Sequence, residues 1–144
     1  MFSEEAMVNM ADGTVKSISL IVARDYILDK FNNPVKVTRL IKTIQQVVQM
    51  VQLNNNTDPF YITSDTLFLC VYVYNNGINI TSEYTTMDII QKFNGQLKSS
   101  LKVFSKESNA SILMYNTDLI RKDVYTLELQ NSDSYLVCNI ITTV

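Results

Sequence analysis

The chain has 144 residues, of which 47% are hydrophobic and 18% charged, and its formal net charge at pH 7 is −2. A chain of this length fits one domain and can bury about 70% of the surface that its unfolded form exposes. We therefore expect a single domain over residues 1–144. The negative charge excludes a global electrostatic footprint for nucleic acid. The absence of histidine excludes serine–histidine, cysteine–histidine and histidine–metal sites.

The beginning of the chain predicts neither export nor membrane insertion. Residues 1–7 carry acidic groups where a signal peptide needs positive charge, and no apolar run reaches the ~18 residues of a membrane span. Cys70 and Cys138 lie in apolar segments far apart in the sequence, which is typical of free, buried thiols. We expect a soluble, cytoplasmic protein whose residues 1–13 form a loosely held N-terminus.

Residues 14–31 are apolar on every helical face, with no clean polar stripe. Such a segment is either a buried helix or, around residues 18–22, a strand. A helix is favoured because Asp12 can cap it and no breaker occurs before residues 32–34.

Residues 35–53 predict an amphipathic helix. The apolar side chains that fall within about a third of the helical circumference are Val37, Leu40, Ile41, Ile44, Val47, Val48 and Val51. Several of these are β-branched and form helices poorly, so packing against a partner surface must hold this helix. The polar run 54–59 ends it.

The next segments predict strands. Residues 60–63 favour a short strand, and residues 67–74 favour a nearly all-apolar strand that is covered on both faces. Asn76 and Gly77 tolerate the positive φ that a type I′ turn requires, so they predict a hairpin with a return strand over residues 78–84.

A further amphipathic helix is expected over residues 86–107, beginning at a capping-box-like Thr85-Thr86-Met87-Asp88. Gly95 lies on the face of this helix away from the apolar stripe, where a neighbouring backbone could come close. Three strands, at residues 110–116, 124–129 and 135–142, complete the chain. The predicted fold is α/β (α+β), a central and mainly antiparallel sheet with flanking helices, in the order α-α-β-β-α-β-β-β.

No catalytic, cofactor or metal site is expected. Asp118, Asp123 and Glu128 flank strands and are interpreted as solvated charges, and three unclustered glycines exclude a phosphate-binding loop. Basic helix faces leave a nucleic-acid-binding accessory protein, possibly viral, as the alternative function. The candidates for the basic face are Lys36, Arg39, Lys42 and Lys106, together with Lys92, Lys98 and Lys102.

The order strand, Asn76-Gly77, strand, Thr-Thr, helix and three strands resembles the roadblock/LC7 family of longin- and profilin-like scaffolds. The resemblance implies a non-enzymatic interaction subunit that dimerises, or joins a larger complex, through its helix over residues 86–107 and a sheet edge. It also implies a protein partner, in GTPase-linked, motor or trafficking assemblies. The expected interface residues are Lys92, Gly95, Lys98, Ser99, Lys102, Ile112 and Met114.

Overall fold

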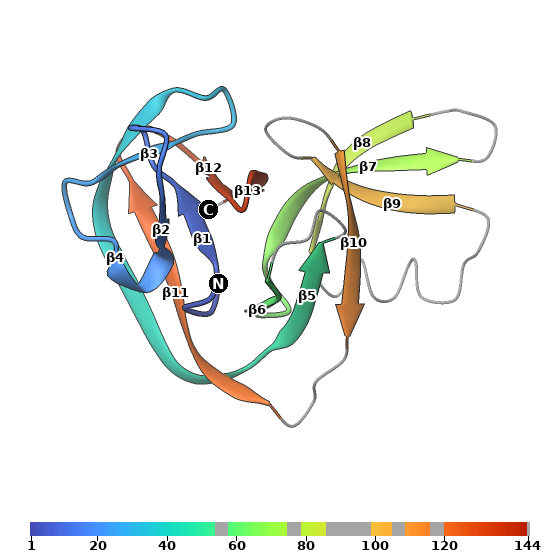
Figure 1. The fold of residues 1–144 in the computed structure, drawn as a ribbon, viewed down its shortest axis with the longest axis horizontal. Helices are drawn as coiled ribbons and strands as arrows, with labels where there is room; N and C mark the ends of the chain where they lie inside the picture. The colour runs from blue at the N-terminus through green and yellow to red at the C-terminus, as the bar shows by residue number, and fades with distance from the viewer. Residues whose placement is uncertain (54–57, 75–78, 86–98, 105–108, 116–119, 144) are drawn as a thin grey trace.

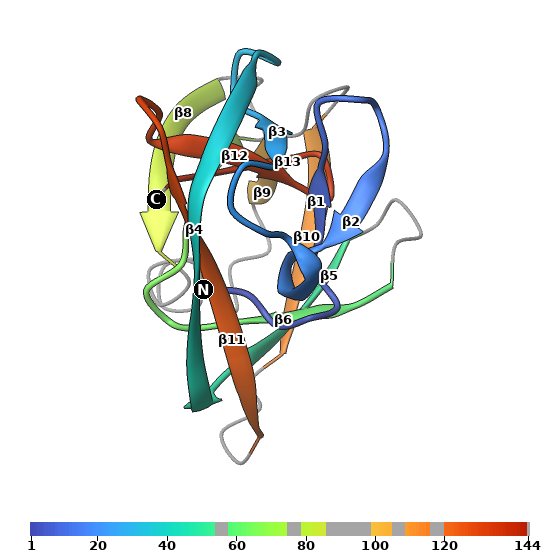
Figure 2. The ribbon, with the colours of Figure 1, turned by 90° about the vertical axis from the view of Figure 1, so that its left-hand side faces the viewer.

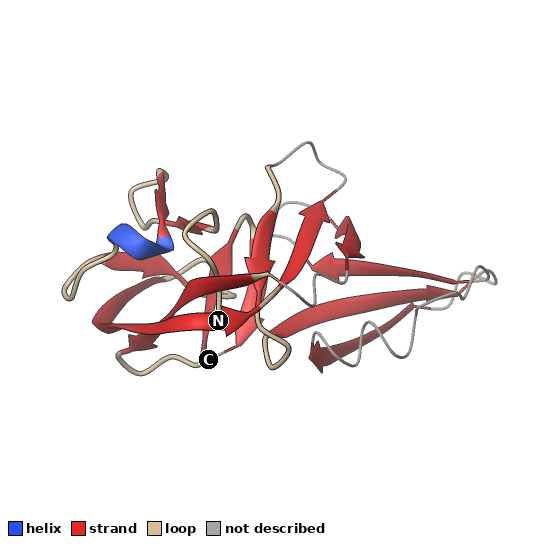
Figure 3. Ribbon diagram, turned by 90° about the horizontal axis from the view of Figure 1, so that it is seen from below, coloured by secondary structure: helices blue, strands red, loops and turns tan. Residues whose placement is uncertain are grey.

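The computed structural model describes residues 1–53, 58–74, 79–85, 99–104, 109–115 and 120–143. In this part of the chain the protein is built from strands, and its one helical element is the 3-10 turn η1 (Ile18–Leu20) (Figure 3). In chain order the strands are β1 (Met7–Asn9), β2 (Val15–Ser17), β3 (Tyr26–Leu28), β4 (Pro34–Val47), β5 (Gln49–Leu53), β6 (Phe60–Ile62), β7 (Leu67–Tyr74), β8 (Asn79–Thr85), β9 (Ser99–Phe104), β10 (Asn109–Tyr115), β11 (Arg121–Leu129), β12 (Ser134–Val137) and β13 (Ile140–Thr143).

The strands form two antiparallel sheets. A ten-stranded sheet runs in the order β2-β1-β12-β13-β7-β9-β10-β5-β6, with β8 paired to β7, and a three-stranded sheet runs in the order β11-β4-β3. Figure 1 shows β1 to β4, β11 and β12 on one side and β5 to β10 on the other, with both ends of the chain between them.

The longest element is the two-stranded ribbon of β4 and β11, which runs the height of the molecule in Figure 2. The pairing extends from Arg121 opposite Val47 to Leu129 opposite Val37, with register shifts after Lys122 and after Glu128. The chain then continues through Val48 into β5, so this ribbon connects the two sides of the fold.

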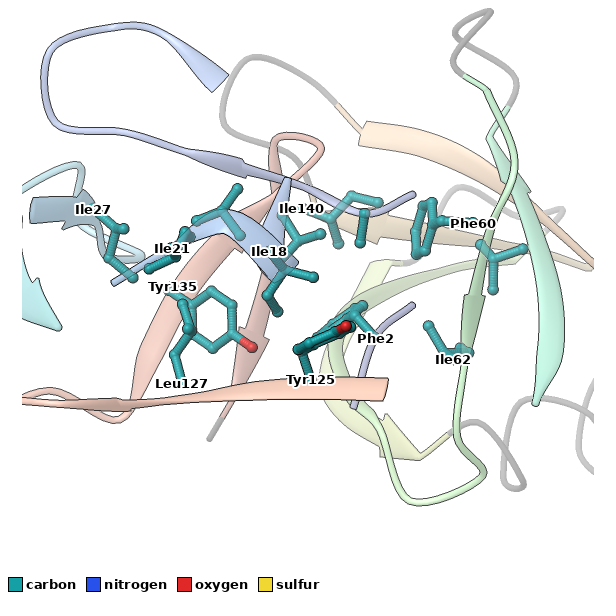
Figure 4. Close-up of a cluster of buried hydrophobic side chains, with 14 of the residues drawn as sticks. Phe2, Ile18, Ile21, Ile27, Phe60, Ile62, Tyr125, Leu127, Tyr135 and Ile140 are labelled. Carbon is teal, nitrogen blue, oxygen red and sulfur yellow. The ribbon is translucent and has the colours of Figure 1, made fainter. Parts of the chain in front are cut away.

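The core gathers around Phe2, which is 2% exposed. Its ring packs against those of Phe60, Phe68 and Tyr135, with centroids 6.2, 6.2 and 6.3 Å away. Figure 4 shows these rings continuous with buried side chains from η1, β3, β11 and β13. The first residues of the chain therefore fill the centre of the protein, and the expected loose N-terminus over residues 1–13 is wrong.

The flanking helices of the α/β prediction are also wrong. Residues 14–31 form β2, η1 and β3, and residues 35–53 form β4 and β5. Their β-branched residues suit an extended backbone. A helical apolar stripe arises there because the register shifts in the β4–β11 ribbon interrupt the strict alternation expected of a strand.

Most of the predicted strands are confirmed. β6, β7, β8, β10 and β11 lie within one to three residues of their expected ranges, and β7 pairs antiparallel with β8 as expected. Residues 135–142 form two strands, because Cys138 and Asn139 adopt φ values of 49° and 65° and turn β12 back into β13.

The third predicted helix is tested only in part. Residues 86–98 and 105–108 lie outside the described residues, as does the predicted turn at Asn76 and Gly77. Residues 99–104 form β9, so at least this stretch of the expected helix is extended. Within the described part of the chain, no helix has the length and apolarity needed to cross a membrane.

Candidate functional site: the junction of the two chain ends

The first three residues insert between the two sides of the fold. Phe2 exchanges backbone hydrogen bonds with Tyr125 of β11, at 2.9 and 2.7 Å. The Ser3 amide donates to the carbonyl of Tyr61 in β6, and the Tyr61 amide donates to the Ser3 hydroxyl at 3.0 Å. These bonds fix the backbone on the C-terminal side of Met1.

The α-amine of Met1 lies in a cradle of hydroxyl groups at the turn between β6 and β7. It donates to Thr63 Oγ1 at 2.9 Å and to Thr66 Oγ1 at 2.8 Å. Both threonines are buried, at 7% and 4% exposure. Thr63 Oγ1 in turn donates to the carboxylate of Asp65, which is exposed. The amine, two hydroxyls and a carboxylate thus form one connected hydrogen-bond network.

This environment changes the acidity of the amine. Removal from water disfavours the charged form and lowers the pKa of the Met1 amine to about 6, although the Asp65 carboxylate acts in the opposite direction. An amine with this pKa is mostly uncharged at neutral pH. More of it is therefore in the uncharged, nucleophilic form at this pH than for an ordinary α-amine.

The carbonyl of Met1 is held at the same turn. It accepts from the Thr63 amide at 3.1 Å and from the Thr66 hydroxyl at 3.1 Å. With its amine, its carbonyl and the next residue all bonded, the Met1 backbone has a single fixed orientation relative to the two threonine hydroxyls.

The other end of the chain reaches the same place. β13 pairs antiparallel with the start of β7, with Thr143 opposite Leu67 and Thr142 opposite Phe68. The Thr142 hydroxyl donates to the Leu67 carbonyl at 2.8 Å. Residues opposite each other in such a pair have Cα atoms about 4.5–5.5 Å apart. Residue 143 is therefore paired with the neighbour of Thr66, which contacts residue 1.

The chemistry of this junction follows from its groups. The Met1 side chain is a thioether, which has no acidic proton and cannot take up an acyl group, and the chain holds no histidine to act as a base. Hydroxyl groups of threonine, a carboxylate and an uncharged amine remain. Such groups can exchange an acyl group between nitrogen and oxygen.

A polar cavity of about 250 Å³ includes Ser3 in its lining. Its charges are largely matched within it, since Lys122 Nζ lies 2.6 Å from Glu5 Oε1 and the Asp123 carboxylate accepts from the Gln45 amide. Burial raises the pKa of the Glu5 carboxyl, but hydrogen bonds from Lys122 and Ser3 outweigh it and leave the pKa below its usual value. The lining residues are Ser3, Glu4, Glu5, Gln45, Arg121, Lys122, Asp123 and Tyr125.

Comparison with known proteins identifies the architecture. No family model matches the chain, and no curated protein matches it in sequence. Solved structures do match. The gp41-1 intein is 18% identical with a TM-score of 0.68, covering 99% of this chain and 97% of that one. The DnaB intein from Synechocystis sp. PCC 6803 is 17% identical with a TM-score of 0.67, covering 99% and 96%. The present chain has the fold of an intein.

A third match is the splicing domain of the Msm DnaB1 intein, 10% identical with a TM-score of 0.61 over 99% of this chain and 98% of that one. These identities are low, so the likeness concerns the fold. It overturns the roadblock/LC7 resemblance. The non-enzymatic scaffold function and the nucleic-acid-binding alternative are corrected with it, because a fold used for protein splicing replaces the one that implied a passive subunit.

The predicted basic-face residues do not share a helix in this intein-like fold. Lys36, Arg39 and Lys42 lie along β4. Arg39 Nη2 is 2.6 Å from Glu128 Oε1, and Lys42 Nζ is 3.5 Å from Asp123 Oδ2, so both charges pair with β11. Glu128 and Asp123 therefore form ion pairs across the ribbon. The prediction that they are solvated charges left these ion pairs out.

The predicted interface residues fall mostly in other places. Lys92, Gly95, Lys98 and Lys106 lie outside the described residues. Ser99 and Lys102 are in β9, and Ile112 and Met114 are in β10, where Ile112 pairs with Leu53 and Met114 with Val51. Strand pairing brings β9 and β10 together, but as part of the sheet and not across a helix face. Whether a protein partner binds them stays a prediction.

The sequence interpretation missed Met1, Thr63, Asp65 and Thr66 altogether. The sequence predicts a short strand over residues 60–63 and a loose end at residue 1, with no site at either place. The only local signal is the cluster of hydroxyl and carboxyl groups between two predicted strands, which is also typical of an ordinary turn.

Cys138 lies on the strand turn beside β1 as a free thiol, as predicted. Burial raises its pKa, and the hydrogen-bonding contact with the Met7 backbone opposes this only partly. This thiol is therefore protonated at neutral pH and is a poor nucleophile. It contributes packing next to the core.

Proposed function

We propose that this protein is a self-processing domain of the intein type, which rearranges the peptide bond that joins a preceding residue to Met1. The observation that carries the proposal is the meeting of both chain ends at the turn 63–66. The Met1 amine bonds to Thr63 and Thr66, and Thr143 pairs with Leu67. A reaction between two ends of one chain needs them in fixed, close positions, which removes most of the entropic cost of bringing the groups together.

Two further features support the proposal. Burial favours the uncharged form of the Met1 amine, which is the form released when the bond to a preceding residue breaks and the nitrogen takes up a proton. The backbone bonds of Met1, Phe2 and Ser3 hold the reacting nitrogen still.

The test is a fusion in which the full chain lies between two foreign domains, with no other protein added. We expect mass spectrometry to detect a cleaved product with a new end at Met1, or a product in which the two foreign domains are joined. A fusion that stays intact for days at pH 7–8, while circular dichroism shows it folded, would contradict the proposal.

A further inference from the structure

The pair of hydroxyl groups at the turn 63–66 fits a free α-amine better than it fits the nitrogen of a peptide bond. We infer that this turn is a binding site for the α-amine that cleavage before Met1 exposes, and that this binding holds the cleaved protein against rejoining. The inference rests on the proposed function and assigns a further role to the same junction, after the bond has broken.

The number of protons on the nitrogen distinguishes the free from the joined state. The Met1 amine donates to Thr63 Oγ1 at 2.9 Å and to Thr66 Oγ1 at 2.8 Å. An uncharged amine has two N–H groups, one for each hydroxyl, whereas the nitrogen of a peptide bond has one. With a residue joined to Met1, a single N–H group is left for the two hydroxyls.

Both hydroxyls are oriented to accept from an amine. The Thr66 hydroxyl donates its own proton to the Met1 carbonyl, and the Thr63 hydroxyl donates its proton to the Asp65 carboxylate. Since a hydroxyl has one proton and two lone pairs, each oxygen meets the amine as an acceptor. Two acceptors side by side are the complement of a group with two donors.

Charge acts in the same direction. The Asp65 carboxylate attracts the protonated fraction of the Met1 amine. A peptide nitrogen carries no charge and has no such attraction. Burial favours the uncharged amine, so at neutral pH this attraction only adds to the two hydrogen bonds, which are made in either protonation state.

Binding of one product shifts the equilibrium of a reversible step toward that product. Rejoining would form a bond from the Met1 nitrogen to the acyl carbon of an ester or thioester, while a proton of the amine passes to the departing alcohol or thiol. The uncharged amine is nucleophilic, but the peptide nitrogen that results has one N–H fewer. The equilibrium therefore lies further toward the cleaved state than it would without the two hydroxyls.

The experiment compares the full chain carrying a free Met1 amine with the same chain acetylated there, the smallest acyl group. In urea at pH 7 the α-amine, with a pKa near ~8, is acetylated before the lysines, with pKa values near ~10.4, and mass spectrometry identifies the singly acetylated product for refolding. Guanidinium chloride melts at pH 9, above the pKa of the amine in both states, remove its protonation from the comparison. We expect acetylation to lower the folding equilibrium constant by about 2- to 12-fold, the usual net contribution of one hydrogen bond.

Valine variants test whether the loss comes from the two hydroxyls. Thr63→Val or Thr66→Val leaves one hydroxyl, which the single N–H of an acetylated nitrogen can still satisfy. The loss on acetylation should therefore shrink to less than about twofold in either variant. The matched control is Thr38→Val, since Thr38 is an exposed residue of β4 that bonds to the Glu128 carbonyl in the ribbon. This control should show the full loss.

The outcomes separate the inference from the proposed function. Equal stability of the free and acetylated chains would overturn the inference, as would an undiminished loss in the valine variants. If a valine variant fails to fold, Thr63→Ala or Thr66→Ala takes its place. None of these melts involves cleavage, so they leave the proposed function standing. A fusion that never cleaves contradicts the proposed function, while the binding of the amine can still be measured on the free chain.

Discussion

The core around Phe2 and the ribbon of β4 and β11 are stabilised in different ways. The core buries aromatic and aliphatic side chains from both ends of the sequence, and Phe2 alone contacts three other rings. The ribbon adds Val37 and Leu127 to this core, but its far end is held by strand pairing and by exposed ion pairs, and it leaves Ile44 and Val47 at 66% and 40% exposure. Because apolar burial contributes most of the favourable free energy and exposed ion pairs contribute little, stability should depend on the core.

This difference bears on the junction of the chain ends. Phe2 follows Met1 directly, so the residue that anchors the core also anchors the proposed reacting nitrogen. The fold thus places a buried aromatic side chain next to an amine whose pKa is lowered by burial. Changes in the core should therefore affect stability more than changes in the exposed part of the ribbon.

Phe2→Ala should be the most damaging change. Removal of a buried aromatic side chain costs about 3–5 kcal/mol, a large part of the ~5–15 kcal/mol that stabilises a typical domain. The matched control is Phe31→Ala, since Phe31 is 70% exposed in the loop before β4. Urea denaturation should show a large loss for Phe2→Ala and a change within ~0.5 kcal/mol for Phe31→Ala. Equal midpoints for the two variants would show that the core is not centred on Phe2.

The Met1 amine should make stability depend on pH. Its pKa is 8.0 in the unfolded chain and about 6 in the folded protein. The unfolded state therefore binds more protons between pH 6 and 8, so the free energy of unfolding rises with pH across this window. The buried amine should destabilise the folded protein by about 2–3 kcal/mol below pH 6, and this destabilisation should be absent above pH 8.

No histidine side chain contributes to the pH dependence in this window, because the chain holds none. Denaturant melts at pH 6, 7 and 8 would measure it. A flat profile would mean that the amine is exposed to water in solution and not held by Thr63 and Thr66.

Asn139 should contribute through its turn between β12 and β13. Its φ is 65°, and its side-chain oxygen accepts from Asn9 Nδ2 at 2.7 Å, where Asn9 is buried. Asn139→Ala leaves that donor without its partner and places alanine in the left-handed region, at a cost of about 1–3 kcal/mol. Asn139→Gly loses the same bond but not the backbone conformation, so it should be about 1 kcal/mol more stable than the alanine variant. Thermal melts in which Asn139→Ala is more stable than Asn139→Gly would contradict the left-handed conformation of residue 139.

The exposed ion pair of the ribbon should have the smallest effect. The side chains of Arg39 and Glu128 are 64% and 46% exposed, and pairs of this kind contribute about 0–1 kcal/mol. A double-mutant cycle with Arg39→Ala and Glu128→Ala measures the coupling directly. A coupling above ~2 kcal/mol would show that the ribbon is stabilised by charge more strongly than its exposure indicates.

The sequence by itself determined where several strands lie. Residues 67–74 are too apolar and too rich in β-branched and aromatic side chains for a surface helix, and they form β7 as expected. The antiparallel pairing of β7 with β8 also follows from local sequence, because the two strands are close neighbours along the chain. The absence of histidine chemistry is a matter of composition alone.

Only the tertiary structure decided between helix and strand at residues 35–47. Their apolar pattern fits both periods, and the choice depends on pairing with β11, which lies about 80 residues later in the chain. The junction of the chain ends is decided in the same way. Met1 and Thr63 are separated by 62 positions, and short hydroxyl side chains carry no motif that would connect them in a sequence. Their contact depends on the buried Phe2, which holds the first residue against the turn between β6 and β7.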